Sequence, residues 1–288
     1  MNILVIGMCG NSLFYNKESN TLLKEEPGGK GYNQAVGISK LGGTVSFIGA
    51  IGNDQSGIEC SKYLESVRVN NLLIRKETNT TFATIHVDKC GNNYINVSFG
   101  AKLDYSDIEY IKKQIMRHDV ILLQNEIDVN LNKEIIDYAY LLNKLIIMNP
   151  APIAPWVKEY LSKLNLVTPN EEEARVLFNI PDNITYDLLG NYLIKKNINN
   201  ALITLGDKGA LLIKDGYSTY FNSLKVKAID TTGAGDLMNA CIAYGLSKNI
   251  SIDDAIKLGI VACGYSVQRK FVLESYPFMK DIKEKIKL

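Results

Sequence analysis

The sequence is poor in the residues that most metal and nucleophilic sites need. It has two histidines, His86 and His118, in 288 residues. Several His or Cys ligands usually complete a transition-metal site, and a Ser-His-Asp triad needs a histidine beside its nucleophile. A histidine-rich metal site and such a triad are therefore disfavoured. We expect each histidine to be structural or exposed.

Cysteine is also sparse, and no Cys-x-x-Cys pair occurs. The five cysteines are odd in number and widely spaced: Cys9, Cys60, Cys90, Cys241 and Cys263. This pattern favours reduced, mostly buried thiols in a cytoplasmic protein over a disulfide framework. The opening residues, MNILVIGMCG, lack the basic start of a signal peptide and predict a first strand.

Charge of one sign and long apolar runs are both lacking. The net charge is +1, so no electrostatic argument favours nucleic acid or an anionic membrane surface as a partner. No uncharged apolar run approaches the length of a membrane span. Hydrophobic residues make up 46% and charged residues 22% of the chain, which is ordinary for a folded soluble protein.

Short β-rich segments alternate with helical patterns along the chain, which predicts a mostly parallel sheet with helices on both faces. We read 1–288 as one α/β domain. The stretch 81–100 differs, because it alternates apolar and polar residues around KCGNN and so predicts a hairpin. Paired with the segment after Ser12, it would form a small β lid with elements at about 12–27 and 81–101. Strands are predicted at 2–7, 44–52, 119–124, 144–150, 164–170 and 200–206, a hairpin at 210–222, and helices at 30–42, 56–67, 130–144, from 171, 185–197, 234–247 and 252–268.

The stretch DTTGAGD, residues 230–236, has more glycine and acid than a turn needs. Glycines at a strand-to-helix junction let backbone N–H groups converge on an anion at the helix N-terminus. An N-cap acid would explain Asp236 but not the two glycines and Asp230 as well. The pattern favours an anion site in which Asp236 takes a proton from a hydroxyl that attacks phosphorus.

DTTGAGD resembles the C-terminal signature of the ribokinase-type family of sugar kinases, and PGGKGYNQAVGISKLG (27–42) resembles its N-terminal motif. Three further segments are similar and collinear: NPAP (149–152), TPNEEEA (168–174) and ITLGDKG (203–209). The likeness extends from residue 1 to about 277. It implies a ribokinase-like three-layer α/β fold and transfer of the ATP γ-phosphoryl group to a hydroxymethyl group of a sugar.

The resemblance also implies roles for single residues. Asp236 would be the catalytic base, and the anion hole would be formed by Gly233, Ala234 and Gly235. Sugar hydroxyls would be bound by Asn11, Ser12, Gly29, Lys30, Asn33 and Glu126. Lys30 is followed by Gly31 rather than by Ser or Thr, so a P-loop NTPase is disfavoured, and no G-x-G-x-x-G follows the first strand, which argues against a nicotinamide-dependent oxidoreductase.

Further positions match the ATP and metal sites of the family. ATP would contact Asn170, Glu173, Thr204, Gly206, Asp207, Lys208, Gly209 and Gly235. Glu173 would act on Mg²⁺ through water, although Asn170 and Glu173 are also good helix-start residues in their own right. The family's potassium site corresponds to Asp230, Thr232, Ser266, Arg269, Phe271 and Ser275. Phe271 stands where ribokinases usually have glycine, and it would be strained if φ there is positive, so potassium binding stays open.

The sequence departs from the family where the first strand ends. Gly10, Asn11 and Ser12 replace an Asn-x-Asp that grips the sugar hydroxyls, and the loss of one charge-assisted bond should weaken ribose binding by roughly one or two orders of magnitude. Ile260 stands near the expected adenine, where ribokinases often carry a polar residue.

The segment from Ser12 to Pro27 is shorter than ribokinase lid strands, which weakens the homodimer that paired lids would otherwise imply. The alternatives left open are a nucleoside or sugar-phosphate kinase of the same family, and a non-catalytic sugar-sensing homologue. The intact glycines and Asp236 argue against the homologue without activity.

Overall fold

The computed structural model describes residues 1–87 and 93–286, so the turn predicted within KCGNN lies, apart from Asn93, outside the described residues, as does Cys90. A central sheet of nine strands has the order β15-β14-β13-β12-β11-β10-β1-β4-β6. In this sheet the β13–β14 and β14–β15 pairs are antiparallel, and the other pairs are parallel. The strands are β1 (Ile3–Ile6), β4 (Val45–Ile48), β6 (Asn70–Asn71), β10 (Val120–Gln124), β11 (Leu145–Asn149), β12 (Leu166–Val167), β13 (Ala201–Thr204), β14 (Ala210–Lys214) and β15 (Tyr217–Phe221).

The central strands are buried on both faces, as their near-continuous Ile, Leu and Val runs predict. Alternate residues of β1 enter opposite cores: Ile3 and Val5 pack on one face, and Leu4 and Ile6 on the other. Two hydrophobic clusters therefore sandwich the sheet. This confirms the three-layer α/β fold with a mostly parallel sheet.

Helices contribute to both clusters. The first face carries α1 (Lys30–Lys40), α8 (Ala234–Ser247) and α9 (Ile252–Ser266), with α2 (Gln55–Ser66) and α10 (Met279–Ile282) at its margins. The second face carries α3 (Ile108–Met116), α4 (Val129–Leu141), α5 (Val157–Tyr160), α6 (Glu171–Leu177) and α7 (Tyr186–Lys195). Short 3-10 turns lie at Tyr105–Asp107, Leu161–Lys163, Gly206–Lys208 and Lys283–Lys285.

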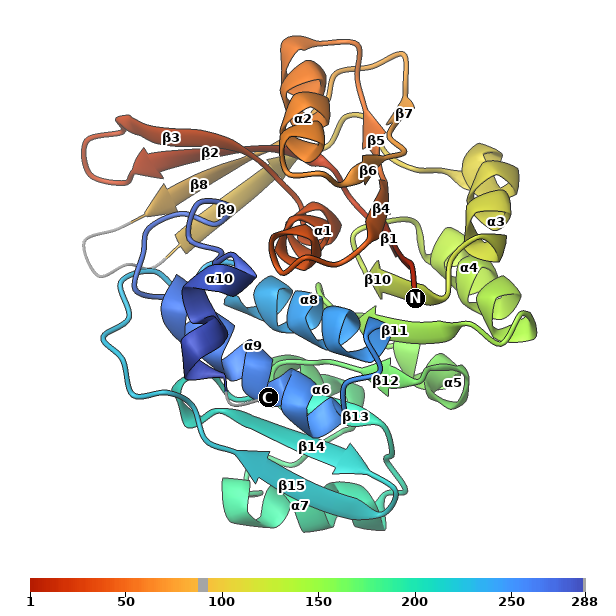
Figure 1. The fold of residues 1–288 in the computed structure, drawn as a ribbon, viewed down its shortest axis with the longest axis vertical. Helices are drawn as coiled ribbons and strands as arrows, with labels where there is room; N and C mark the ends of the chain where they lie inside the picture. The colour runs from red at the N-terminus through yellow and green to blue at the C-terminus, as the bar shows by residue number, and fades with distance from the viewer. Residues whose placement is uncertain (88–92, 287–288) are drawn as a thin grey trace.

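A second, four-stranded sheet of order β3-β2-β8-β9 projects beside the central one (Figure 1). It contains β2 (Gly10–Asn16), β3 (Leu22–Gly28), β8 (Thr81–Val87) and β9 (Asn93–Ser98), with β2 and β8 parallel. These strands occupy the two segments expected for the lid. A two-stranded sheet of β5 (Ala50–Ile51) and β7 (Ile74–Arg75) lies near its base. Only Gly29 separates β3 from α1, so lid and helix are directly joined.

The described histidines and cysteines have the environments that the sequence predicts. His118 is buried and contacts the Gln114 carbonyl and the Ser46 hydroxyl, while His86 stacks on Tyr15. The four described cysteines are free, and only Cys263 among them is not fully buried. No helix of the described residues is both long and apolar enough to cross a membrane.

Candidate active site

The start of α8 is open to an anion. Gly233 is the residue before the helix and has φ 77°, a conformation that suits glycine. A Cβ on Gly235 would meet no atom within 4 Å, so the space above the first turn is free. Because N–H groups in the first turn of a helix have no partner four residues earlier, this terminus has donors and a positive dipole end for a negative ligand.

Asp236 lies in that first turn and is 8% exposed. Two amides from α1 hold its carboxylate: Asn33 Nδ2 donates to Oδ2 and Gln34 Nε2 donates to Oδ1, each over 3.0 Å. Burial raises the pKa of Asp236, and the opposing effects of Lys30, Asn33 and Gln34 do not cancel it. An oriented carboxylate with a raised pKa is suited to accepting a proton.

Lys30 and two more carboxyl groups share the same site. The Lys30 backbone N–H donates to Glu126 Oε2 over 2.7 Å. Burial raises the pKa of Glu126 to about 7, with Lys30 lowering it and Asp236 raising it further. Burial alone would lower the pKa of Lys30, but Asp236, Glu126 and Glu173 together raise it. The site therefore keeps one cation among three acidic groups.

Sequence reasoning missed a chain of polar side chains behind Asp236. Gln34 Nε2 also donates to Asn149 Oδ1, and Gln124 Nε2 donates to Gln34 Oε1. The Thr168 hydroxyl donates to Asn239 Oδ1, and Asn239 Nδ2 donates to the Gly235 carbonyl. The only sequence signal is position, because Gln34 follows Asn33 directly and Asn149 and Thr168 begin the quoted segments NPAP and TPNEEEA.

A polar cavity brings together most of the residues predicted for catalysis and phosphate binding. Asn170 and Glu173 reach it from the start of α6, where each accepts a backbone N–H of the other in a capping box. The cavity is lined by Lys30, Asn149, Ala151, Thr168, Asn170, Glu173, Thr204, Gly233, Gly235, Asp236 and Asn239.

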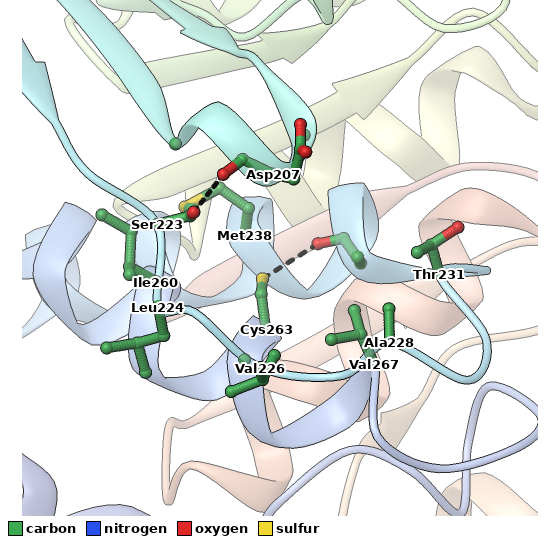
Figure 2. Close-up of a pocket in the computed structure, with 14 residues that line it drawn as sticks. Asp207, Ser223, Leu224, Val226, Ala228, Thr231, Met238, Ile260, Cys263 and Val267 are labelled. Carbon is green, nitrogen blue, oxygen red and sulfur yellow. Dashed lines mark hydrogen bonds between the residues drawn. The ribbon is translucent and has the colours of Figure 1, made fainter.

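A second, apolar pocket is lined in part by Thr231 and Ala234, which flank Gly233 of the glycine-rich turn (Figure 2). Leu224, Val226, Ile260 and Met238 extend into it, and Cys263 donates to the Ala234 carbonyl on its wall. Ile260, which the resemblance puts near the adenine, thus lines this apolar pocket. The remaining lining residues are Gly206, Asp207, Gly209, Ser223, Ala228, Thr231, Ala234, Cys263, Gly264 and Val267.

Lys208 belongs to neither space. Its ammonium group lies 3.6 Å from the centre of the Tyr186 ring and donates to that residue's hydroxyl. Tyr186 in turn donates to Glu171, so this part of the predicted nucleotide loop is fixed to α6 and α7.

The residues predicted for potassium form two groups. Asp230 Oδ1 accepts from the Thr232 N–H and hydroxyl, and Asp230 Oδ2 accepts from the Phe271 N–H over 3.0 Å. The hydroxyl oxygens of Ser266 and Ser275 are 2.6 Å apart, and the Arg269 N–H donates to the Ser266 carbonyl. Phe271 has φ 67°, so the strain considered from the sequence is present. The described residues contain no cluster of three His, Cys, Asp or Glu suited to a metal.

Of the predicted sugar ligands, Lys30 lines the polar cavity, whereas the other five do not: Asn11, Ser12, Gly29, Asn33 and Glu126. Asn11 is 3% exposed, and its Nδ2 donates to Glu25 Oε1 over 2.5 Å and to the Ser56 hydroxyl over 3.4 Å. Ser12 follows on β2 and packs so close to Gly28 that a Cβ there would lie 2.4 Å from its hydroxyl. Asn11 is therefore held by neighbouring side chains within the lid region.

The fold and the helix-terminus site define a phosphotransferase that acts on an alcohol. The family model of the pfkB family carbohydrate kinases matches residues 2–278. The chain is 32% identical to the ribokinase of Bacillus subtilis over 278 residues, which cover 92% of each protein. It is 30% identical to the deoxyribokinase of Salmonella typhimurium over 284 residues, 94% of this chain and 92% of the relative.

A solved structure agrees with these relatives. The ribokinase of Thermotoga maritima superimposes with a TM-score of 0.84 at 30% identity, covering 100% of both chains. The chain therefore belongs to the pfkB family of carbohydrate kinases, and the ribokinase-type resemblance seen in the sequence is confirmed.

Proposed function

We propose that this carbohydrate kinase transfers the γ-phosphoryl group of ATP to a hydroxymethyl group of a ribose-like sugar, with Asp236 as the base. The observation that carries the proposal is the buried Asp236 carboxylate at the open N-terminus of α8, in one cavity with Lys30. As the sugar oxygen forms its bond to phosphorus, Asp236 takes the hydroxyl proton. The bond from phosphorus to the β–γ bridging oxygen breaks, and ADP leaves.

The other parts of the site support this reaction, because they suit the nucleobase, the transferred group and Mg²⁺. The apolar pocket suits a nucleobase, and the open first turn of α8 would place N–H donors around the transferred group. Lys30 adds positive charge to the same cavity. Glu173 lines the cavity and would hold Mg²⁺ through water, where the ion would neutralise phosphate charge.

The potassium site is a finer part of the proposal. Asp230 and the loop at Phe271 meet behind the anion hole, and carbonyl oxygens there are suitable ligands for a monovalent cation. The cytoplasmic location and the homodimer considered from the sequence stay predictions.

The residues at Asn11 and Ser12, where the family binds sugar hydroxyls, favour a substrate with fewer hydroxyl contacts than ribose. Ser12 stands where the family has an aspartate, and Asn11 is engaged by Glu25 and Ser56. One relative is named deoxyribokinase. A 2-deoxypentose is therefore the second candidate, and we expect ribose itself to be non-preferred, with a KM above the ordinary enzyme range.

The test is ADP release over pentoses, deoxypentoses, hexoses, nucleosides and phosphosugars, with and without potassium. We expect turnover with a pentose or deoxypentose and none in Asp236→Asn, which should still bind ATP. Equal turnover in Asp236→Asn would refute the base. Turnover with nucleosides or phosphosugars alone would replace the proposed substrate with the alternative from the same family.

A further inference from the structure

The loop Phe271–Tyr276, which we call the clasp loop, follows α9 and lies between the lid and the N-terminus of α8. In Figure 1 it belongs to the dark blue segment between α9 and α10, close to the lid strands. Neither the cavity nor the apolar pocket is lined by this loop. Its contacts are instead with the two elements on either side of the reaction site.

Three contacts join the clasp loop to the β2–β3 hairpin of the lid. The Phe14 and Phe271 rings meet edge to face with centroids 5.5 Å apart. Lys24 Nζ lies 2.5 Å from Glu274 Oε1. The Val272 N–H donates to Glu26 Oε1 over 2.9 Å.

Glu26 is the buried member of this set. It is 5% exposed, whereas Lys24 and Glu274 form a more exposed ion pair that contributes little by itself. Burial raises the pKa of Glu26, although the N–H groups of Val272 and Leu273 counteract it. A buried carboxyl group bonded to a backbone N–H is costly to leave unpaired, so this contact fixes Val272 relative to β3.

The other end of the clasp loop contacts the residue from which α8 begins. The Tyr276 hydroxyl donates to the Gly233 carbonyl over 2.8 Å, and that carbonyl also accepts the Leu237 N–H over 2.9 Å. A Cβ on Gly233 would lie 2.5 Å from Val272 Cγ1. The loop therefore touches the N-cap glycine through both a hydrogen bond and side-chain packing.

The clasp loop is braced between these two ends. Buried Lys40 of α1 donates to the carbonyls of Leu273 (2.6 Å) and Tyr276 (3.1 Å). The Ser275 hydroxyl lies 2.8 Å from the Val272 carbonyl, which accepts from it. A loop held at so many points moves as a unit, so a shift at Val272 reaches Tyr276.

We propose that Glu26 and Tyr276 are positioning residues for phosphoryl transfer, which the clasp loop connects. With the lid seated, Glu26 fixes Val272, and Tyr276 fixes the Gly233 carbonyl and so orients the first turn of α8 toward the transferred group. A change in the position of the lid therefore changes the geometry of the anion hole. This inference rests on the proposed function of the α8 terminus.

The test compares Glu26→Ala, which removes the acceptor of the Val272 N–H, with Tyr276→Phe, the double variant and two matched controls. Tyr32→Phe removes another buried tyrosine hydroxyl that donates to a backbone carbonyl, that of Cys60. Asp107→Ala removes another buried carboxylate that accepts a backbone N–H, that of Asp104. The hydrogen-bond partners of these two control side chains lie outside the clasp loop.

Since small misplacements of reacting groups reduce rates steeply, we expect each clasp variant to lower kcat by about tenfold, with the KM for ATP little changed. The double variant should be no slower than the slower single variant, because both break one connection. Controls should keep the wild-type kcat. Multiplied losses in the double variant, or an unchanged kcat in the isosteric Tyr276→Phe, would overturn the inference.

A second measurement is independent of turnover. Hydrogen exchange of a peptide covering residues 230–237, followed by mass spectrometry without substrate, should be faster in both clasp variants and unchanged in both controls. Equal exchange in Glu26→Ala and wild type contradicts the connection. If wild type phosphorylated no sugar, the proposed function would fail while this result still decided the connection. Tyr276→Phe decides it alone if Glu26→Ala does not fold.

Discussion

Asp236 and Lys30 illustrate how one residue sets the chemistry of another. Burial makes Asp236 more basic, and Lys30 is the largest influence in the other direction. Asn33 and Gln34 fix the direction of the carboxylate as well as lowering its pKa. The reactivity of the proposed base is therefore a balance between desolvation and one ammonium group.

Lys30→Met should shift the acid limb of the kcat/KM profile to higher pH. Without the ammonium group, burial raises the pKa of Asp236 further, so the carboxylate is protonated and inactive over a wider low-pH range. Glu126 and Glu173 titrate nearby, so the measured value belongs to the group of carboxyls. The measurement is a pH–rate profile of both proteins. Lys112→Met, which changes a lysine of α3 paired with Glu134, is the control. An acid limb at the same pH in Lys30→Met and wild type would show that Lys30 does not change the pKa of the base.

At the scale of elements, the start of α8 is set by two glycines with different tasks. Gly233 has positive φ and no room for a side chain, whereas Gly235 has ordinary helical geometry and open space around it. The first glycine is required by the fold. The second leaves space where an anion would lie.

Gly235→Ala should fold with unchanged or higher stability, by up to about 1 kcal/mol, because alanine is the better helix former. Its kcat should fall strongly, since the methyl group enters the cavity. Gly233→Ala should instead lose about 1–3 kcal/mol of stability through backbone strain, beside its clash with Val272 and Tyr276. Thermal melts and steady-state rates of the pair test this. A Gly235→Ala enzyme with wild-type kcat would mean that the transferred group lies elsewhere.

Helix and strand patterns predicted the elements well where the side-chain period was clear. The helix predicted at 234–247 is α8 with the same bounds, and the lid hairpin pairs with β2 in the expected region. The segment predicted as one strand at 44–52 is interrupted at Gly49 into β4 and β5, and α3 was not predicted at all. The residues of α3, Ile108–Met116, lie outside every motif that guided the interpretation.

The contacts between distant segments were beyond the sequence. Gln34 contacts both Asn149 and Asp236 because α1, β11 and α8 converge, and no local pattern records that. Glu26 is similar, since its burial depends on Val272, 246 residues later. Motifs therefore predicted which residues gather in the polar cavity, whereas the partners that fix those residues needed the fold.

At the scale of the whole molecule, the buried acidic site lowers the free energy of unfolding, by an amount that depends on pH. Glu126 has a pKa of about 7 in the folded protein against an ordinary value of 4.5. Between these two values the folded chain keeps a proton that the unfolded chain has lost. The free energy of unfolding therefore falls as pH rises through this window and stays lower above it.

Glu126→Gln should remove this loss, because the amide is neutral at every pH and its oxygen still accepts the Lys30 N–H. The variant should gain little stability relative to wild type at pH 5 and on the order of 2 kcal/mol at pH 8. Thermal or urea unfolding at both pH values measures the difference. Glu134→Gln, at an exposed ion pair of α4, should show no such growth. A stability difference for Glu126→Gln that is the same at pH 5 and pH 8 would show that this carboxyl is already ionised at pH 5, and the buried acidic site would then be better solvated than its geometry indicates.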